Sequence, residues 1–294
     1  MLKKKLLATD LDGTFLNSKG SVTLENKEAI ARANANGLEV LFVTGRPPRW
    51  LYGVATAANH FNTIIGANGA FIADLEQQIV VQTNPIDSEA LGNVAERILQ
   101  KHSDAVFAIE RAFVGMPIPN SICDNYETMH VTNLSDFEYA ISPGYEVVWK
   151  NVDEIPIVRT EVLLSKPDIT KVLVKPGNPQ GWNSDTWLAE INEIVNGEVQ
   201  TTHASEHVVL AELSSLGITK ATGLAQIAIA KQLNSSEIVA VGDMPNDIPM
   251  LQWAGESWAV ANAHEEVLAT TTNHLPNSDE NAVAKLIDEL ISRN

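Results

Sequence analysis

The sequence predicts an α/β fold in which a parallel-sheet core is interrupted by an inserted α+β module. Three observations support this prediction. Short apolar runs alternate with helix-like segments near both ends of the chain, which is typical of βαβ units. The middle of the chain has strand-like runs that follow one another, which is typical of antiparallel pairing. Three of the outer apolar runs end in acidic or hydroxyl-bearing residues, as at the carboxyl edge of an open parallel sheet.

The first part of the chain has the alternating pattern. It predicts strands at 6–9, 38–43 and 62–72, with helices at 23–36 and from the prolines at 47 and 48 to about residue 59. The first run is continuously apolar, as in a strand that is covered on both faces. Thr23 can cap the first helix, and Gly37 follows its end. An Asn-Gly turn lies within the third strand region.

Residues 84–213 have a different pattern, and we expect them to form the inserted module. They predict helices at 87–102 and 184–196, paired strands at 105–110 and 111–116, further strands at 145–150, 158–165 and 169–176, and a hairpin of 198–204 with 207–213. The alternating pattern then returns, with helices at 221–233, 248–255 and 281–291 and strands at 237–241 and 257–262. The sequence therefore predicts a discontinuous, Rossmann-like parallel-sheet core of residues 1–83 and 214–294.

The charge of the chain limits its partners. It has 294 residues, of which 37 are acidic and 20 are Lys or Arg, giving a net charge of -17. This charge repels phosphate backbones and anionic lipids, so we expect binding to neither nucleic acid nor membranes. The single cysteine, Cys123, permits no internal disulfide and is interpreted as structural, which favours a reduced, cytoplasmic compartment. The sequence has no apolar run long enough for a membrane span or a signal peptide.

Carboxylates gather at the predicted edge of the core sheet. Asp10 and Asp12 follow the first strand, Thr44 and Gly45 follow the second, and Asp243 follows a strand near the end of the chain. Neighbouring carboxylates do not all stay ionised unless a cation joins them. Because the ligands are hard oxygen atoms, the sequence predicts a Mg2+ site at this edge.

The spacing of Asp10 and Asp12 suggests covalent and acid-base chemistry on one reacting atom. In an extended segment residues i and i+2 point the same way, so both carboxylates can flank that atom if the chain bends at Gly13. One can attack phosphorus, while the other can protonate the leaving oxygen and later activate water. Phosphoryl transfer also requires positive charge and hydrogen-bond donors, which Thr44, the Gly45 amide and a lysine could supply.

Two motifs carry a resemblance to a known family. The motif DLDGT at residues 10–14, followed by GDMPND at residues 242–247, resembles the signature of the haloacid dehalogenase (HAD) superfamily of aspartyl-phosphate enzymes. The position of the inserted module between the second and third motifs resembles the Cof-type phosphatases, which carry a large cap there. The resemblance covers nearly the whole chain. It implies that residues 84–213 form a cap that determines substrate specificity.

The resemblance also implies a role for each motif residue. Asp10 would be the nucleophile and Asp12 the general acid and base. The phosphate would be held by the Leu11 amide, Thr44, the Gly45 amide, Lys220 and Asn246. The metal ion would be bound by the Asp10 carboxylate, the Asp12 backbone carbonyl and Asp243, with Asp247 supporting Lys220 or a metal-bound water.

The resulting hypothesis is a Mg2+-dependent phosphatase that hydrolyses small phosphomonoesters through an aspartyl-phosphate, with sugar phosphates favoured by the resemblance. A phosphomutase of the same superfamily and a non-catalytic sensor of phosphorylated metabolites remain alternatives. Dehalogenation is disfavoured, because displacing a halide requires no proton from Asp12. The sequence leaves open whether the chain is a monomer or a homodimer.

A few further residues have two interpretations each. Arg46 could contact the substrate or lie in solvent at the start of a helix. His203 and His207 lie near the expected cap–core junction but lack a metal-binding pattern, so a metal role is disfavoured. Trp182 and Trp187 are interpreted as packing of the cap and not as a platform for sugars.

Overall fold

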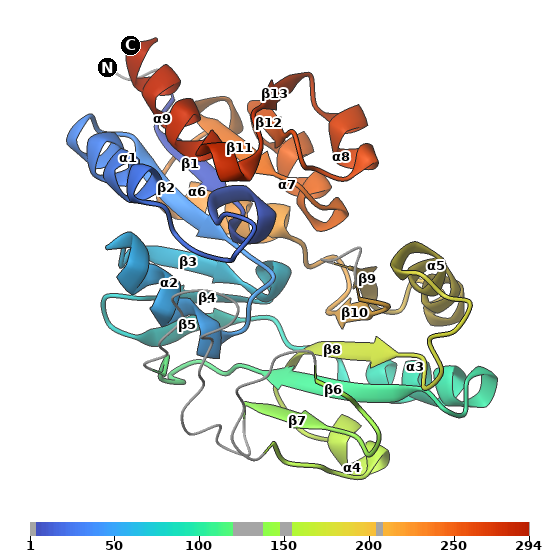
Figure 1. Ribbon diagram of the computed structural model, residues 1–294. Coiled ribbons are helices and arrows are strands. Elements are labelled where there is room, and N and C mark those ends of the chain that lie inside the picture. Colours follow the sequence, from blue (N-terminus) through green and yellow to red (C-terminus); the bar gives the residue numbers. More distant parts are fainter. Residues whose placement is uncertain (1–3, 120–137, 148–154, 204–207, 294) are drawn as a thin grey trace.

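The computed structural model describes residues 4–119, 138–147, 155–203 and 208–293. In this part of the chain the strands form two sheets, which Figure 1 shows one above the other. The eight-stranded sheet has the order β13-β12-β11-β1-β2-β3-β4-β5 and is built from both ends of the chain. The five-stranded sheet has the order β7-β6-β8-β10-β9 and is built from the middle. The expected α/β fold with a separate α+β cap is confirmed, while the limits at residues 84 and 213 stay a prediction.

The core sheet and its helices follow the alternating pattern of the sequence. Their N-terminal part comprises β1 (Leu6–Thr9), α1 (Leu24–Ala35), β2 (Glu39–Val43), α2 (Leu51–Ala58), β3 (Thr63–Gly66), β4 (Phe71–Asp74) and β5 (Ile79–Thr83). Their C-terminal part comprises α6 (Lys220–Ala230), β11 (Ile238–Gly242), α7 (Ile248–Trp253), β12 (Glu256–Val260), α8 (Glu265–Thr270), β13 (Asn273–Leu275) and α9 (Ala282–Ser292). The pairings from β13 to β3 are parallel, and those of β4 and β5 are antiparallel.

Helices cover both faces of the core sheet, which explains its continuously apolar strands. Leu7 of β1 packs on the face that α1, α2 and α9 cover. Leu6 and Ala8 point to the opposite face, which α6, α7 and α8 cover. Thr23 caps α1 as predicted, because its side chain accepts a hydrogen bond from the Asn26 amide. Of the described residues, none belongs to a helix long and apolar enough to cross a membrane.

The cap sheet is antiparallel throughout and has helices on one face. Its elements are α3 (Ser88–Lys101), β6 (Val106–Arg111), β7 (Tyr139–Ile141), α4 (Thr160–Leu164), β8 (Ile169–Lys175), α5 (Ser184–Val195), β9 (Gln200–Thr202) and β10 (Ala211–Ser214). Phe107, Val172 and Leu213 share a buried cluster with α3 and α5. The expected hairpin near residues 198–213 is present as the pair β9 and β10.

Two predicted strands of the cap are wrong. Residues 112–116 do not pair with β6, because β7 and β8 already occupy the two edges of that strand. They instead turn at Gly115, where φ is +89°, and the Gly115 amide donates to the Val80 carbonyl. Residues 160–164 form the helix α4, which buries the adjacent Leu163 and Leu164 together. In a strand these two side chains would point to opposite faces.

Other departures are smaller. The region 62–72 forms two antiparallel strands, β3 and β4, joined at the Asn-Gly turn. Residues 145–147 lie outside the strands, and the rest of that predicted strand lies outside the described residues. The elements β5, α8 and β13 were not predicted.

We predict that Trp187 stabilises the cap. Its side chain is fully buried, and its Nε1 donates to the Val174 carbonyl at 2.9 Å. Trp187→Ala is expected to lower the free energy of unfolding by about 3–5 kcal/mol, because it removes a large buried ring. Urea denaturation followed by circular dichroism would measure the change. Trp182→Ala is the matched control, since Trp182 is only partly buried; an equal loss in both variants would contradict the prediction.

Candidate active site

The loop after β1 places Asp10 at the carboxyl edge of the core sheet. The Asp10 amide donates to the Val241 carbonyl at 3.0 Å, which holds the residue beside the end of β11. The chain then turns at Gly13, where φ is +80°. A Cβ at this glycine would lie 2.2 Å from Asp243 Oδ2, so only glycine permits this close approach. Thr14 Oγ1 donates to Asp243 Oδ1 at 3.0 Å and fixes the orientation of that carboxylate.

The loop after β11 supplies Asp243 and Asp247. Asp247 Oδ2 accepts hydrogen bonds from the amides of Asp243 and Met244, at 3.0 and 3.1 Å. A Cβ at Gly242 would lie 2.5 Å from Asp247 Cγ, so the glycine makes room for this fold of the loop. The loop therefore holds the Asp247 side chain rigidly beneath the site.

Lys220 joins the two acidic loops. It is the first residue of α6, its side chain is fully buried, and Thr219 caps the helix in front of it. Lys220 Nζ donates to Asp10 Oδ1 and to Asp247 Oδ1, each at 2.6 Å. Burial alone would lower the pKa of Lys220, but the two carboxylates together raise that pKa above its ordinary value. The lysine is therefore a permanent positive charge.

The acidic side chains outnumber this single lysine. Carboxylate oxygens of Asp10, Asp243 and Asp247 all lie within 4.8 Å of one another, and the three residues are buried. Burial raises the pKa of Asp10 from 3.8 to about 7, although Lys220 opposes the shift. Burial, followed by the charges of Asp10 and Asp247, raises the pKa of Asp243 well above its ordinary value. A divalent cation fits this site, because it would balance charges that one lysine leaves in excess.

The three carboxylates of this acidic triad, Asp10, Asp243 and Asp247, differ in their remaining capacity to bind a metal ion. Both oxygens of Asp247 are already engaged, by Lys220 and by backbone amides. Asp10 and Asp243 are therefore the carboxylates with coordination capacity left. The side chain of Asp12 takes another direction, because both of its oxygens are bound by Arg46.

Arg46 is the largest addition to the predicted site. Its side chain is 3% exposed, and its Nε and Nη2 donate to the two Asp12 oxygens at 2.8 and 2.5 Å. The interpretation of Arg46 as a solvated helix start is wrong. Thr44 is also buried, and its Oγ1 accepts a hydrogen bond from the Arg46 amide at 3.1 Å. The loop after β2 therefore orients an acid-base candidate as well as a phosphate-binding candidate.

Asn246 lies beside a residue that the sequence did not single out. Asn246 Nδ2 donates to Asn68 Oδ1 at 3.0 Å, and Asn68 adopts a left-handed conformation in the turn after β3. A Cβ at Gly45 would lie 3.1 Å from the same Asn68 oxygen. The sequence predicted a turn at this Asn-Gly pair. It could not predict that the turn lies beside Gly45 and Asn246, because that depends on how the chain folds.

Of the two histidines singled out in the sequence, His203 lies in the described part of the chain and His207 does not. His203 is buried, and its Nε2 lies 2.9 Å from Asp185 Oδ1, while His264 Nε2 lies 4.0 Å from the same oxygen. Neither histidine is among the candidate metal-binding groups of the described chain, although the His264 amide donates to the Asp243 carbonyl at 2.8 Å. His207 and Cys123 lie outside the described residues.

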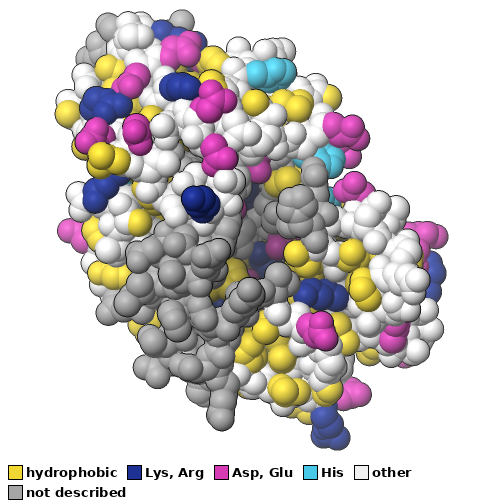
Figure 2. Space-filling model, in the orientation of Figure 1, with side chains coloured by type: hydrophobic (Ala, Val, Ile, Leu, Met, Phe, Trp, Pro, Cys, Tyr) yellow, Lys and Arg dark blue, Asp and Glu magenta, His cyan; other side chains and the backbone are white. Residues whose placement is uncertain are grey.

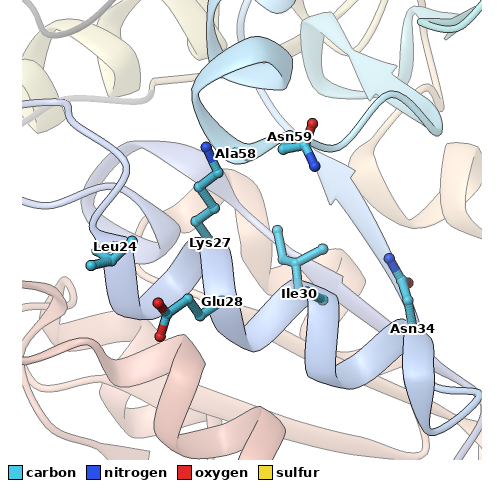
Figure 3. A pocket seen from close by; sticks show the side chains of 8 residues that line it. Leu24, Lys27, Glu28, Ile30, Asn34, Ala58 and Asn59 are labelled. Carbon is cyan, nitrogen blue, oxygen red and sulfur yellow. The ribbon is translucent and has the colours of Figure 1, made fainter.

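A separate surface groove does not compete with this site. It has a volume of about 350 Å³ and lies between α1 and the end of α2. Figure 3 shows that its charged side chains are Lys27 and Glu28, which come from one helix. The groove has no cluster of acidic residues, so the functional chemistry of the described chain is concentrated at the carboxyl edge of the core sheet.

Comparison with known proteins identifies the family. The model for haloacid dehalogenase-like hydrolases matches residues 7–287. The chain belongs to this family. It is 27% identical to the 5-amino-6-(5-phospho-D-ribitylamino)uracil phosphatase YwtE and 29% identical to the phosphatase YwpJ, both of Bacillus subtilis. The alignments cover 98% of this chain in both cases, and 98% of YwtE and 100% of YwpJ.

Solved structures agree with this assignment. The structure of the sugar phosphatase BT4131, of HAD subclass IIB, superposes with a TM-score of 0.75 at 21% identity, over 97% of this chain and 98% of that one. A structure of SMU.1108c from Streptococcus mutans gives a TM-score of 0.76 at 20% identity, over 98% and 99% of the two chains. The expected HAD membership and enzyme class are confirmed, and the fold is shared along the whole chain.

We predict that the acidic triad couples stability to pH and to divalent metal. Because the pKa of Asp10 is raised from 3.8 to about 7 in the folded protein, the folded state binds a proton more tightly than the unfolded chain. Without metal, stability is therefore expected to fall as the pH rises from about 4 through 7. Mg2+ should restore more stability at pH 7.5 than at pH 5, because it binds the ionised carboxylates of the folded state.

Thermal unfolding in EDTA and in Mg2+, at both pH values, would measure these effects. Asp10→Asn is the control, because it removes this titration and should weaken the pH dependence, to which Asp243 also contributes. An identical Mg2+ effect at pH 5 and pH 7.5 would contradict the prediction.

Proposed function

We propose that the protein is a Mg2+-dependent phosphatase that hydrolyses small phosphomonoesters through a phosphorylated Asp10. The observation that carries this proposal is the position of Lys220, which donates to the Asp10 and Asp247 carboxylates at 2.6 Å. A phosphoryl group brought to Asp10 would meet a buried, permanently charged ammonium. Such preorganised charge is the main requirement for phosphoryl transfer.

The remaining motif residues are proposed to hold the phosphate. Thr44 lies in the loop after β2 with the Gly45 amide, and Asn246 lies in the loop after β11. The Leu11 amide belongs to the turn that follows Asp10. These groups come from adjacent strand ends, so their hydrogen-bond donors can surround one phosphate. In this arrangement Lys220 balances charge on both the phosphate and Asp10.

Asp10 and Asp243, with the backbone carbonyl of Asp12, are proposed to hold the metal ion. Mg2+, when bound, supplies positive charge that keeps Asp10 ionised and offsets the phosphate oxygens. The proposal agrees with the raised pKa values of Asp10 and Asp243, which are caused first by burial and then by the neighbouring carboxylates. Asp247 would position Lys220 without binding the metal.

Asp12 is proposed to protonate the leaving oxygen and then to activate water. Arg46 binds both of its oxygens. Arg46 would therefore hold the carboxylate in place. One of the two bonds must open so that Asp12 can take up a proton from solvent before it transfers that proton to the leaving oxygen. The two residues lie on adjacent loops, after β1 and β2.

Sugar phosphates are the proposed substrate class. BT4131 is named a sugar phosphatase, and the substrate named for YwtE carries a phosphorylated ribityl chain. We also propose a cytoplasmic location, given the single cysteine. A phosphomutase would transfer the phosphoryl group back to a second position of the sugar, and a sensor would bind the phosphate without cleaving it. Phosphate release distinguishes hydrolysis from both alternatives.

We predict that Asp10→Asn abolishes phosphate release. An amide is a far weaker nucleophile than a carboxylate, so turnover of every phosphomonoester should fall at least a thousandfold. Malachite-green detection of phosphate with a panel of sugar phosphates, with and without Mg2+, would measure the loss. Circular dichroism would show that the fold is retained. Turnover near the wild-type level in this variant would falsify the proposal, and binding without any release by the wild type would favour a sensor.

We predict a different defect for Asp12→Asn. Loss of the acid and base is expected to slow sugar phosphate hydrolysis by about 10²–10⁴-fold. With 4-nitrophenyl phosphate, whose leaving group needs no proton, Asp10 should still be phosphorylated and 4-nitrophenol should appear as a single burst. Rapid-quench kinetics would detect the burst, and Asp10→Asn in the same assay should show none. Steady turnover of both substrates by Asp12→Asn would exclude this role for Asp12.

A further inference from the structure

Three charged side chains project from the cap sheet toward the core. Glu110 of β6, Lys171 of β8 and Glu212 of β10 alternate with residues such as Ile109, Val172 and Leu213 that pack against the cap helices. Successive side chains of a strand point to opposite faces, so these charges lie on the helix-free face of the sheet. All three are buried. In Figure 2 charged side chains of both signs lie in the hollow between the upper and lower parts of the molecule.

Two of these residues contact the loops of the proposed phosphate site. Lys171 Nζ donates to the Gly45 carbonyl at 2.6 Å and lies 3.2 Å from Glu212 Oε2. Glu212 Oε2 also accepts from Asn68 Nδ2 at 2.8 Å, and Asn68 Oδ1 in turn accepts from Asn246. The charged face of the cap is therefore joined to the phosphate loops by a continuous series of hydrogen bonds. A leaving group attached to a phosphate in this site would project into the same region.

Two buried acceptors in this region lack donors. Glu110 Oε1 accepts from Arg49 Nη2 at 2.9 Å, but Glu110 Oε2 has no hydrogen-bond partner within the described part of the chain. Asn246 Oδ1 is likewise buried and unpaired with respect to the described residues. Leaving a buried acceptor without a donor destabilises the folded protein. Hydroxyl groups of a ligand are the donors that would satisfy them.

The charges around these acceptors are balanced. Arg49 and Lys171 are positive, and Glu110 and Glu212 are negative, so the described ion pairs have no net charge. Glu138 adds a carboxylate near Arg49, and burial raises the pKa of this group. The described ion pairs therefore offer no surplus positive charge to a leaving group that carries its own carboxylate or phosphate. A neutral leaving group with several hydroxyls could donate to Glu110 Oε2 and Asn246 Oδ1 and accept from Lys171.

We propose that Lys171 and Glu212 determine the leaving-group specificity of this enzyme and select a neutral, hydroxyl-rich leaving group over an anionic one. This inference rests on the proposed phosphatase function. The hydroxyls donate to the unpaired Glu110 Oε2 and Asn246 Oδ1 and to Glu212, and Lys171 donates to a neighbouring oxygen. When the substrate enters, these bonds replace part of the direct contact between the cap and the loops at Gly45 and Asn68.

The test compares three phosphomonoesters whose leaving groups differ. Sorbitol 6-phosphate has a neutral hydroxyl-rich leaving group, 2-phosphoglycolate has an anionic one, and phenyl phosphate has no hydroxyl. For Glu212→Gln and for Lys171→Gln, the ratio of kcat/KM for sorbitol 6-phosphate to kcat/KM for phenyl phosphate is expected to fall at least tenfold. Glu212→Gln should also raise the relative kcat/KM for 2-phosphoglycolate, because it removes a repelling charge.

Lys175→Gln is the matched control. Lys175 lies on β8 and on the same face as Lys171, but it is half-exposed and contacts the Glu146 carbonyl. This variant should leave both ratios unchanged. Equal losses for all three substrates in Glu212→Gln and Lys171→Gln would overturn the proposal, because they would indicate a contact that only closes the cap. Unchanged ratios would overturn it as well.

Failure of the phosphatase function would give a separate result. If the wild type cleaves none of the three compounds, calorimetry with Asp10→Asn can still measure their binding. Weaker binding of sorbitol 6-phosphate after adding Glu212→Gln would then support the specificity assignment while excluding the catalytic proposal. Equal affinities with and without Glu212→Gln would exclude the specificity assignment.

Discussion

The buried ammonium of Lys220 is the charge on which the site depends. Parallel strands bring the ends of β1 and β11 together, and each end supplies carboxylates. Without a cation these groups would repel one another in a place that water does not screen. Lys220 neutralises part of this charge by donating to Asp10 and Asp247. The charge that remains on Asp10 and Asp243 favours binding of a divalent ion. The same group of buried carboxylates therefore requires Lys220 for the fold and would hold the metal ion for the proposed reaction.

Charged pairs also join the cap to the core. Arg49 of the core binds Glu110 of the cap, and Lys171 of the cap binds the Gly45 carbonyl of the core. Buried pairs of this kind add little net stability, because desolvation of the charges offsets their attraction. They do fix the position of the two parts, since a shifted cap would leave charges buried without partners. When the cap moves away from the core, water can solvate these charges, so opening the interface costs little free energy. Such opening would be needed for a substrate that binds between the cap and the core.

The sequence predicted the structure best where the residue types of a short segment alone determine both its conformation and its place in the sheet. Apolar runs predicted the core strands, and the acidic motifs at their ends predicted Asp10 and Asp243 as neighbours. The resemblance to the HAD superfamily added Lys220, and the structure places the three residues together. Prediction failed where partners lie far apart in the chain. Residues 112–116 and 160–164 have apolar patterns that suit a strand, but available sheet edges and helix packing determined their structure. The contacts of Arg46 and Asn68 with motif residues become visible only in the folded chain.

The alternation of side chains along a strand explains how one cap sheet serves two purposes. Val172 and Leu213 pack against helices, whereas their neighbours Lys171 and Glu212 face the core. A one-residue shift in register would exchange these faces and bury charges against apolar helices, so the packing of the cap core fixes the orientation of the charged face. The apolar residues that pack beneath the sheet therefore act indirectly on the specificity that we propose for Lys171 and Glu212. The packing of the cap core does not depend on which side chains face the catalytic core. Under the proposed specificity role, changes of these side chains would alter the leaving-group preference while the buried charges around Lys220 stay the same.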